Sequence, residues 1–423
     1  MPQPFTVILG KALRSMLRLK GGGSALPGLF VEKIDPDFIK NTLAQLPKGV
    51  VIISGTNGKT TTTKIVVSLL EAHGLTVFTN RTGSNFTRGV AAALLADINT
   101  RGKLKADIAV LELDEAHAVK FIDAVQPRYS LILNVMRDQL DRFGEIDSTA
   151  KLLTKLAVST SHSVVLNRED PRVRGIQNLL TKQQVSYFGL SDPLLATFPS
   201  DDDMHNQKVT KTKRPPANVL LKSYKDDHVT MSIEGKEIST SIKLTGIYNV
   251  FNSAAAVALT KAVLGKDFKL DITQKTLATV TPAFGRGESV EVGGQPLELV
   301  LVKNPSGFRL GLESFSPNGY ATMIAINDNY ADGRDMSWLW DVTFTSLAIN
   351  GVSHVSGIRA YDMALRLQYD EIPVGTVNTD LASSLRQFIK QNAESPKRIY
   401  CTYTAMLALR RELAKITKVE VIS

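Results

Sequence analysis

Short apolar runs alternate with amphipathic segments of helical length through the N-terminal half of the chain. The apolar runs have strand length and few charges, as buried parallel strands do, and lie at 50–53, 75–79, 108–113, 130–135 and 163–166. The helix-like segments between them lie at 61–73, 87–98, 115–122 and 148–159. This order predicts an α/β fold with a doubly wound, mainly parallel sheet and a ligand at the carboxyl ends of its strands.

The pattern changes near residue 195. Residues 196–216 are polar and proline-containing, which predicts a loop-like insert. Three stretches with alternating apolar and polar positions follow, at 218–224, 228–233 and 237–244, and they predict a small antiparallel meander. A helical pattern resumes after Gly246.

A second α/β pattern begins near residue 286. Its strands are predicted near 298–302, 321–326, 353–356 and 398–402. Its helices are predicted near 307–313, 336–348, 360–368, 379–391 and 403–415. A chain of 423 residues exceeds what one core usually organises. We therefore expect a larger domain over 1–285 and a smaller C-terminal α/β domain over 286–423.

Composition narrows the class of protein. No apolar stretch is long enough to cross a bilayer and no secretion signal is present, so we expect a cytoplasmic protein. Cys401 is the single cysteine, which excludes an intramolecular disulfide and a cysteine-rich zinc site. It lies in a predicted buried strand, which favours a packed thiol. The histidines show no ligand spacing, so we expect no zinc.

The net charge of +9 has several explanations. The basic residues are scattered and form no nucleic-acid-binding motif, so we expect no nucleic-acid partner. Anionic substrates or the anionic inner face of the membrane would explain the charge equally well. Residues 11–20 are basic and partly amphipathic. A solvated helix face is our preferred interpretation of this segment, and peripheral membrane contact is the alternative.

The most informative motif follows the first apolar run. A buried strand, a glycine turn and a helix start bring backbone N–H groups and a positive helix end to one place, where a phosphate can bind. Lys59 would reach the β- and γ-phosphates, and the Thr60 hydroxyl would hold Mg²⁺. We expect ATP to bind Gly55, Thr56, Asn57, Gly58, Lys59, Thr60 and Thr61. A chance glycine turn is the alternative.

Further polar residues follow strand ends or open helices. Glu112 ends the third predicted strand, where a carboxylate can ligate Mg²⁺. Asn249 and Asn252 open the helix after Gly246 and could bind an adenine or cap the helix.

These segments, in this order, resemble the ATP-binding central domain of the Mur ligases, whose glycine loop has the same short G-T-N-G-K-T form. The resemblance implies that Thr60, Ser84 and Glu112 lie at the Mg²⁺ site. It also implies that the nucleotide contacts Asn167, Asp170, Asn249, Asn252 and Arg286. Lys303 lies where the C-terminal domain of that family presents a lysine to the phosphates, so the resemblance implies a catalytic role for it. Gln139 stands where amino-acid-adding members have a Mg²⁺-binding histidine, and Lys151 is one position away from their carbamylated lysine, so we assign it no role.

Four segments refine the resemblance: 80–85, 137–142, 302–305 and 332–341 are similar to the MurT family, the synthetase subunits of lipid II isoglutaminyl synthases. The similarity extends over roughly 25 to 423. It implies ATP-dependent amidation of the D-glutamate α-carboxylate in the lipid II stem peptide through an acyl phosphate. It also implies a heterodimer with a GatD-like glutamine amidotransferase, which supplies ammonia. Many members carry a four-cysteine zinc ribbon, which this chain lacks.

The resemblance further implies that an aspartate from 328–341 completes the partner's Cys–His pair. Asp341 is our first candidate and Asp335 the second, and helix capping or surface ion pairing is the alternative for both. Trp338 and Trp340 precede Asp341 and would suit an interface if exposed together.

Two other functions remain open at this point. An amino-acid-adding ligase of the Mur or folylpolyglutamate type would share the ATP chemistry but use an amine substrate. A nucleotide-binding module without catalysis would leave lipid II unchanged.

Overall fold

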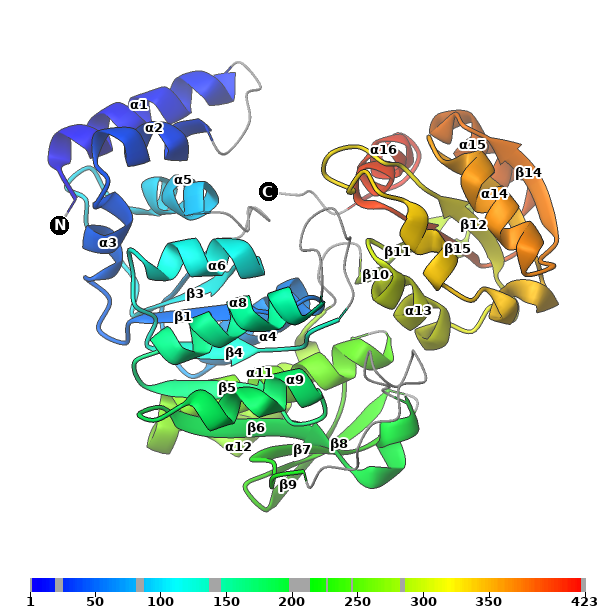
Figure 1. The fold of residues 1–423 in the computed structure, drawn as a ribbon. Helices are drawn as coiled ribbons and strands as arrows, with labels where there is room; N and C mark the ends of the chain where they lie inside the picture. Colours follow the sequence, from blue (N-terminus) through cyan, green and yellow to red (C-terminus); the bar gives the residue numbers. More distant parts are fainter. Residues whose placement is uncertain are drawn as a thin grey trace.

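The computed structural model describes residues 2–19, 26–80, 87–136, 146–197, 214–225, 227–244, 246–281 and 286–419. Two sheets organise the chain, one built from residues 50–241 and the other from residues 286–401 (Figure 1). The smaller sheet and its helices lie beyond the carboxyl ends of the parallel strands of the larger one. The α/β prediction is confirmed.

The larger sheet has the strand order β2-β3-β1-β4-β5-β6-β7-β8-β9. Its strands are β1 (Val50–Ser54), β2 (Val77–Thr79), β3 (Ile108–Glu112), β4 (Tyr129–Ile132), β5 (Ser163–Asn167), β6 (Gln184–Leu190), β7 (Val219–Lys225), β8 (His228–Ile233) and β9 (Lys236–Ser241). Pairing is parallel from β2 to β7, and β7, β8 and β9 pair antiparallel. The predicted meander is confirmed, and it extends the parallel sheet instead of forming a separate one.

Helices cover both faces of the larger sheet, as doubly wound folds require. The helices are α1 (Pro4–Leu19), α2 (Leu26–Ile34), α3 (Phe38–Leu43), α4 (Lys59–Ala72), α5 (Thr87–Asp97), α6 (Glu115–Ile122), α8 (Ile146–Ser159), α9 (Pro171–Gly175), α11 (Ile247–Leu264) and α12 (Leu270–Thr279). Short 3₁₀ helices are η1 (Ile176–Leu179), η2 (Asp192–Thr197) and η3 (Gly265–Asp267). Val51 and Ile53 of β1 pack toward α4 and α11, whereas Val50 and Ile52 pack toward α5 and α6.

The smaller sheet has the order β10-β11-β15-β12-β13-β14, and all its pairs are parallel except β10 with β11. Its strands are β10 (Arg286–Val292), β11 (Gln295–Leu301), β12 (Ala321–Ala325), β13 (Val352–Ser356), β14 (Val374–Asn378) and β15 (Lys397–Cys401). Its helices are α13 (Pro305–Ser314), α14 (Ala360–Tyr369), α15 (Leu381–Gln391) and α16 (Tyr403–Leu413), with 3₁₀ helices η4 (Ser337–Asp341) and η5 (Thr345–Ile349).

The helix predicted over 336–348 is wrong. The chain forms η4, turns extended at Val342 (φ −104°, ψ 134°), and then forms η5. The β-branched pair Val342-Thr343 lowers helix propensity at this break, and Val342 is fully buried there.

Cys401 is fully buried at the end of β15, as predicted for a packed thiol, and burial raises its pKa. Among the described residues, no helix combines the length and the apolar character needed to cross a membrane. The predicted insert at 196–216 lies largely outside the described residues.

Candidate active site

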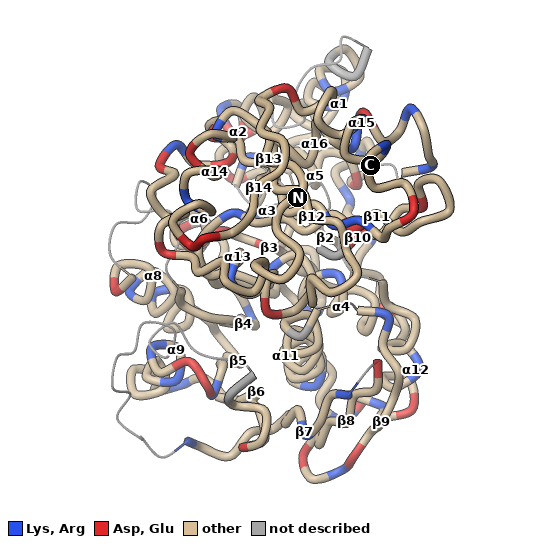
Figure 2. The backbone as a smooth tube through the Cα atoms, turned by 90° about the vertical axis from the view of Figure 1, so that its right-hand side faces the viewer, with Lys and Arg blue, Asp and Glu red and all other residues tan. Residues whose placement is uncertain are grey.

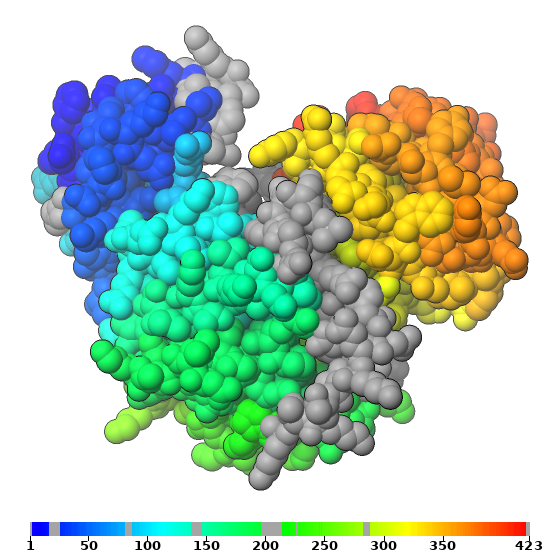
Figure 3. Space-filling view, viewed as in Figure 1, coloured from blue at the N-terminus to red at the C-terminus, as the bar shows by residue number. Residues whose placement is uncertain are grey.

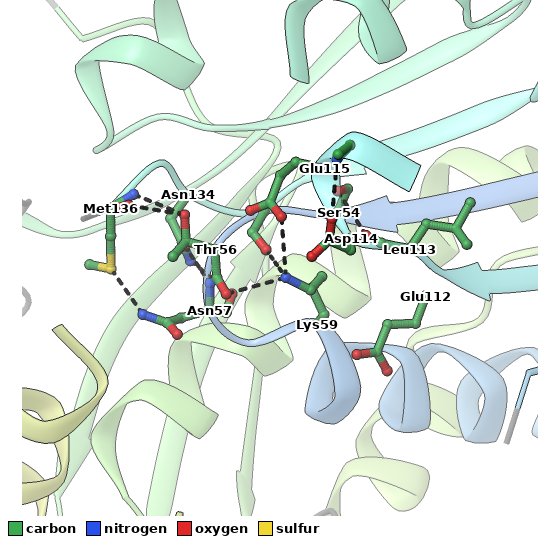
Figure 4. A network of polar contacts seen from close by, with 12 residues as sticks. Ser54, Thr56, Asn57, Lys59, Glu112, Leu113, Asp114, Glu115, Asn134 and Met136 are labelled. Atoms are coloured by element: carbon green, nitrogen blue, oxygen red, sulfur yellow. Dashed lines mark hydrogen bonds and ion pairs between the residues drawn. The ribbon is translucent and has the colours of Figure 1, made fainter. Parts of the chain in front are cut away.

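The glycine loop connects β1 to α4 and is buried (Figure 4). Gly55 (φ +135°) and Gly58 (φ +89°) adopt conformations that other residues rarely adopt. A Cβ on Gly55 would lie 2.9 Å from the backbone N of Asn134. A Cβ on Gly58 would lie 2.5 Å from the Oδ1 of Asn252. Both glycines are therefore required by backbone conformation and by close packing.

Asn134, just after β4, holds the loop in place. Its Oδ1 accepts a hydrogen bond from the Asn57 N–H at 2.9 Å, and its Nδ2 donates to the Asn57 carbonyl at 3.0 Å. The Asn134 carbonyl accepts from the Thr56 N–H at 3.1 Å. The Thr56 hydroxyl in turn accepts from the Met136 N–H at 3.1 Å. The conformation of the glycine loop is thus held by the neighbouring strand end.

Lys59 is buried at the start of α4 and is surrounded by oxygen atoms. Its Nζ donates to the carbonyls of Gly55 and, at 3.3 Å, Thr56. It also lies 3.8 Å from the Oε2 of Glu115, a buried residue in the first turn of α6 (Figure 4). Sequence reasoning did not single out Glu115, because nothing in the segment Glu112–Glu115 shows which carboxylate turns toward the loop.

Two of the predicted metal ligands are neighbours. The Thr60 hydroxyl donates to the Oε1 of Glu112 at 2.8 Å. The backbone of Glu112 is fixed by Asn80, whose Nδ2 donates to the Glu112 carbonyl at 2.8 Å and whose Oδ1 accepts from its N–H at 3.0 Å. A hydroxyl at a helix N-terminus and a carboxylate at a strand end are oxygen donors suited to Mg²⁺. Ser84, the third predicted ligand, lies outside the described residues.

The C-terminal unit reaches the same loop. The Nζ of Lys303 donates to the Thr56 carbonyl at 3.3 Å, so Lys303 and Lys59 converge on one oxygen atom. The Nδ2 of Asn304 donates to the Oδ1 of Asn57 at 3.4 Å. Asn304 also caps α13, since its Oδ1 accepts from the Gly307 N–H at 2.7 Å. Lys303 therefore reaches the loop from the residue before a capped helix start.

A pocket lies beside the loop between the two units. Its lining combines residues from both: Asn57, Gly58, Asn134, Tyr248, Asn249, Asn252, Lys303 and Phe315 among others. Asn249 and Asn252, both predicted to bind the nucleotide, thus share one pocket, and their roles there remain predictions. Arg286 begins β10, and its side chain lies outside what the structure describes.

Asn167 and Asp170 lie at the end of β5, behind the loop. The Nδ2 of Asn167 donates to the Leu133 carbonyl at 2.8 Å. Asp170 caps α9 and accepts from the Val135 N–H at 2.7 Å. Burial raises the pKa of Asp170 to about 6, although backbone N–H donors oppose this shift. These contacts hold the segment that carries Asn134, and nucleotide contact by either residue stays a prediction.

The aspartates of 328–341 have different surroundings. Asp332 is buried and accepts from the Thr404 N–H at 2.7 Å, and burial raises its pKa. Asp328 pairs with Arg359 at 2.8 Å. Asp335 accepts from the Ser337 N–H at 2.9 Å at the start of η4. Asp341 is exposed, and its carboxylate has no hydrogen bond or ion pair with any residue that the structure describes.

The two tryptophans face in different directions. Trp338 is 4% exposed and packs in the core of the C-terminal unit. Trp340 is 48% exposed, and its ring lies 5.0 Å from the ring of Tyr369. Exposure of both tryptophans together is therefore excluded, and Trp340 is the one that a partner could reach.

Gly55→Ala is expected to weaken nucleotide binding at least about tenfold, because the new Cβ would meet the Asn134 backbone and the positive φ would be strained. Isothermal titration with ADP measures the loss. Gly175→Ala, where a Cβ meets nothing within 4 Å, is the matched control and should bind as the wild type does. Equal affinities for all three proteins would contradict a phosphate-binding loop.

Two family models match the chain. The Mur ligase middle domain matches residues 53–260, and the MurT ligase C-terminal model matches residues 301–406. The first match includes the glycine loop and Glu112, and the second includes Lys303 and Asp341. The two matches follow the division of the chain into its two sheets.

Solved structures share the fold at low sequence identity. A pseudomurein peptide ligase type C from Methanothermus fervidus has a TM-score of 0.68 and 18% identity, over 90% of this chain and 81% of that one. MurF from Thermotoga maritima, solved in complex with ADP, has a TM-score of 0.66 and 16% identity, over 89% of this chain and 83% of that one. These likenesses establish the Mur ligase fold.

Sequence relatives extend over almost the whole chain. The lipid II isoglutaminyl synthase (glutamine-hydrolyzing) subunit MurT of Streptococcus pneumoniae R6 is 31% identical, over 96% of both chains. The subunit of the same name from Staphylococcus aureus COL is 27% identical, over 88% of this chain and 89% of that one. The chain therefore belongs to the MurT family of lipid II isoglutaminyl synthase subunits, ligases built on the Mur ligase fold.

Proposed function

We propose that this chain uses ATP to activate the α-carboxylate of D-glutamate in the lipid II stem peptide, which ammonia then converts to D-isoglutamine. A GatD-like glutamine amidotransferase, bound as a heterodimer, supplies the ammonia. Family membership supports the overall reaction, since the relatives are named as glutamine-hydrolyzing synthase subunits. The observation that carries the ligase chemistry is the convergence of Lys59 and Lys303, one from each unit, on the Thr56 carbonyl.

The loop residues would bind the phosphates through backbone N–H groups at the start of α4. Thr60 and Glu112, with Ser84 as the third proposed ligand, would hold Mg²⁺, which offsets negative charge on the phosphates when bound. Asn249, Asn252 and Arg286 would contact the nucleotide in and beside the pocket between the units. Lys59 and Lys303 would place positive charge where the γ-phosphoryl group moves.

The proposed chemistry has two steps. A carboxylate oxygen attacks the γ-phosphorus, the bond between that phosphorus and the bridging oxygen breaks, and ADP leaves. Ammonia then attacks the acyl carbon, the bond from this carbon to the phosphate oxygen breaks, and phosphate leaves while the nitrogen loses a proton. The protein contributes mainly position and charge, because phosphoryl transfer needs little covalent participation.

The partner is proposed to dock around η4 and α14. Asp341 is exposed there beside Trp340, which packs edge-on against Tyr369. Tyr361 and Leu365 on α14 are also exposed. Exposed aromatic side chains next to an available carboxylate suit an interface whose centre contains a catalytic group. Asp335 remains the second candidate for this carboxylate.

Hydroxylamine tests the activation step without the partner. Incubated with lipid II, ATP and hydroxylamine, the chain should form a hydroxamate at D-glutamate, because hydroxylamine attacks an acyl phosphate as ammonia does. Hydroxamate should require both ATP and lipid II. ADP release without hydroxamate, or no turnover at all, would argue for a nucleotide-binding module or a different substrate.

Glu112→Gln is expected to raise the Mg²⁺ concentration for half-maximal activity at least about tenfold, since it removes the charged ligand while keeping the side-chain volume. Thr60→Ser keeps the hydroxyl and is the matched control, with a Mg²⁺ requirement close to that of the wild type. Titration of hydroxamate formation against Mg²⁺ measures both. An unchanged requirement in Glu112→Gln would remove Glu112 from the metal site.

A further inference from the structure

The helical hairpin formed by α1 and α2 exposes apolar side chains on its outer surface. Six of them are between 37% and 70% exposed: Phe5, Ile8 and Met16 on α1, and Leu26, Phe30 and Ile34 on α2. The hairpin forms one corner of the molecule, on the far side of α5 from the larger sheet (Figures 1 and 3). Apolar patches of this kind mark interaction surfaces in many proteins.

The exposed surfaces of these side chains do not pack against the rest of the molecule. A different face of the hairpin makes that contact. Val7 and Val31 are fully buried. A Cβ on Gly10 would lie 2.8 Å from Val31 and 2.9 Å from Leu95 of α5. A Cβ on Gly28 would lie 2.1 Å from the backbone of α5. The two glycines therefore let both helices press closely onto α5, and the exposed apolar face remains available.

The charged residues of α1 are all basic. No acidic residue occurs in α1, whereas Lys11, Arg14 and Arg18 do. Figure 2 shows basic and no acidic positions along this helix. On α2, Lys33 is exposed, and Glu32 lies 3.9 Å from Arg88 of α5, which offsets its charge. An apolar face with a basic surround is complementary to an anionic bilayer surface.

We propose that the α1–α2 hairpin binds an anionic lipid bilayer peripherally, with Phe5, Ile8 and Met16 entering the interface and basic side chains meeting the headgroups. α1 has 16 residues and three basic positions, which are features of helices that lie in the plane of the membrane interface. The exposed apolar positions of α1 favour membrane contact over a solvated face. The use of this contact rests on the proposed function, since a lipid-linked substrate is presented only at a membrane surface.

Vesicle co-sedimentation of the full complex tests the proposal. Wild-type protein should bind vesicles of phosphatidylglycerol and phosphatidylcholine, bind pure phosphatidylcholine weakly, and dissociate as salt rises. The double variant Ile8→Glu, Met16→Glu should lower the partition coefficient at least about tenfold, because it places charge on the inserted face. The double variant Lys11→Gln, Lys33→Gln should lower binding to anionic vesicles but leave the weak binding to pure phosphatidylcholine unchanged.

Leu179→Glu is the matched control, because Leu179 is a similarly exposed apolar residue on η1. This variant should bind vesicles as the wild type does. Hydroxamate formation on a soluble stem-peptide substrate without the lipid chain separates this proposal from the proposed function. The hairpin variants should keep that activity, which also shows that they fold. Three results would each overturn the proposal. They are a failure of the wild-type protein to bind anionic vesicles, binding by the hairpin variants equal to that of the wild type, and a hairpin-dependent dimer in place of vesicle binding.

Discussion

Lys59→Met is expected to reduce ATP-dependent activity by about three orders of magnitude or more, measured as hydroxamate formation at saturating ATP. Lys59 is buried and is the first residue of α4, the helix whose N-terminus would bind the phosphates. Methionine keeps much of the side-chain length and removes the charge that would stabilise the moving phosphoryl group. Near-normal turnover in this variant would remove the nucleotide assignment.

Loss of folding is the competing explanation and can be separated. Lys59→Met leaves Glu115 buried without its cation, and breaking a close buried ion pair costs about 3–5 kcal/mol. The separation of 3.8 Å places this pair toward the weaker end of that range. The double variant Lys59→Met, Glu115→Gln should recover much of the unfolding free energy, measured by urea denaturation. It should stay inactive, which shows that the lost ammonium and not instability stops the reaction.

Asp341→Asn is expected to cripple glutamine-dependent amidation by the complex while leaving activity with ammonium salts intact. The reason is that an Asp that orients the partner's catalytic histidine acts on glutamine hydrolysis alone. The same Asp-to-Asn change in the Ser-His-Asp triad of serine proteases lowers kcat about 10⁴-fold. Asp341 is exposed and lies at the end of η4 in the C-terminal unit, whereas the glycine loop belongs to the larger sheet. Parallel assays with glutamine and with ammonium chloride measure the split.

Asp335→Asn provides the matched comparison. Asp335 accepts a hydrogen bond from the Ser337 N–H. Its replacement should lower the free energy of unfolding but leave the ratio of glutamine-dependent to ammonium-dependent activity unchanged. A selective loss of glutamine-dependent activity in Asp335→Asn and not in Asp341→Asn would exchange the two roles. Full glutaminase activity in both variants would contradict the cross-subunit triad.

Most of the fold could be predicted because apolar runs in a parallel sheet are buried on both faces. Val50 to Ile53 illustrate this, since successive side chains pack into two different cores. Strands β6, β10 and β14 were not predicted. β6 begins with exposed or half-buried positions, and β14 is a half-buried edge strand. The edge strands β10 and β14 lack the continuous apolar signal on which the prediction depends, and β6, inside the larger sheet, is buried only toward its end.

The candidate site was predicted in part. The glycine loop, Thr60 and Glu112 follow from local order along the chain, and the structure brings Thr60 and Glu112 into contact. Asn134 and Glu115 were missed as loop partners, because their roles arise only when separate strand ends meet. The signal that could have found them was position, because both lie within three residues of the end of a strand, β4 for Asn134 and β3 for Glu115. Ligands bind at the carboxyl ends of the strands in parallel sheets of this kind.

Mass spectrometry of lipid II tests the central claim most directly. The heterodimer, ATP and glutamine labelled with ¹⁵N at the side-chain amide should give a product in which the label sits on the D-glutamate residue, located by fragmentation. With unlabelled glutamine the product should be lighter by about 1 Da, the difference between a hydroxyl and an amino group. With unlabelled glutamine, an unchanged mass or a gain equal to an amino-acid residue would contradict the account. Location of the ¹⁵N label elsewhere in the stem would contradict it as well.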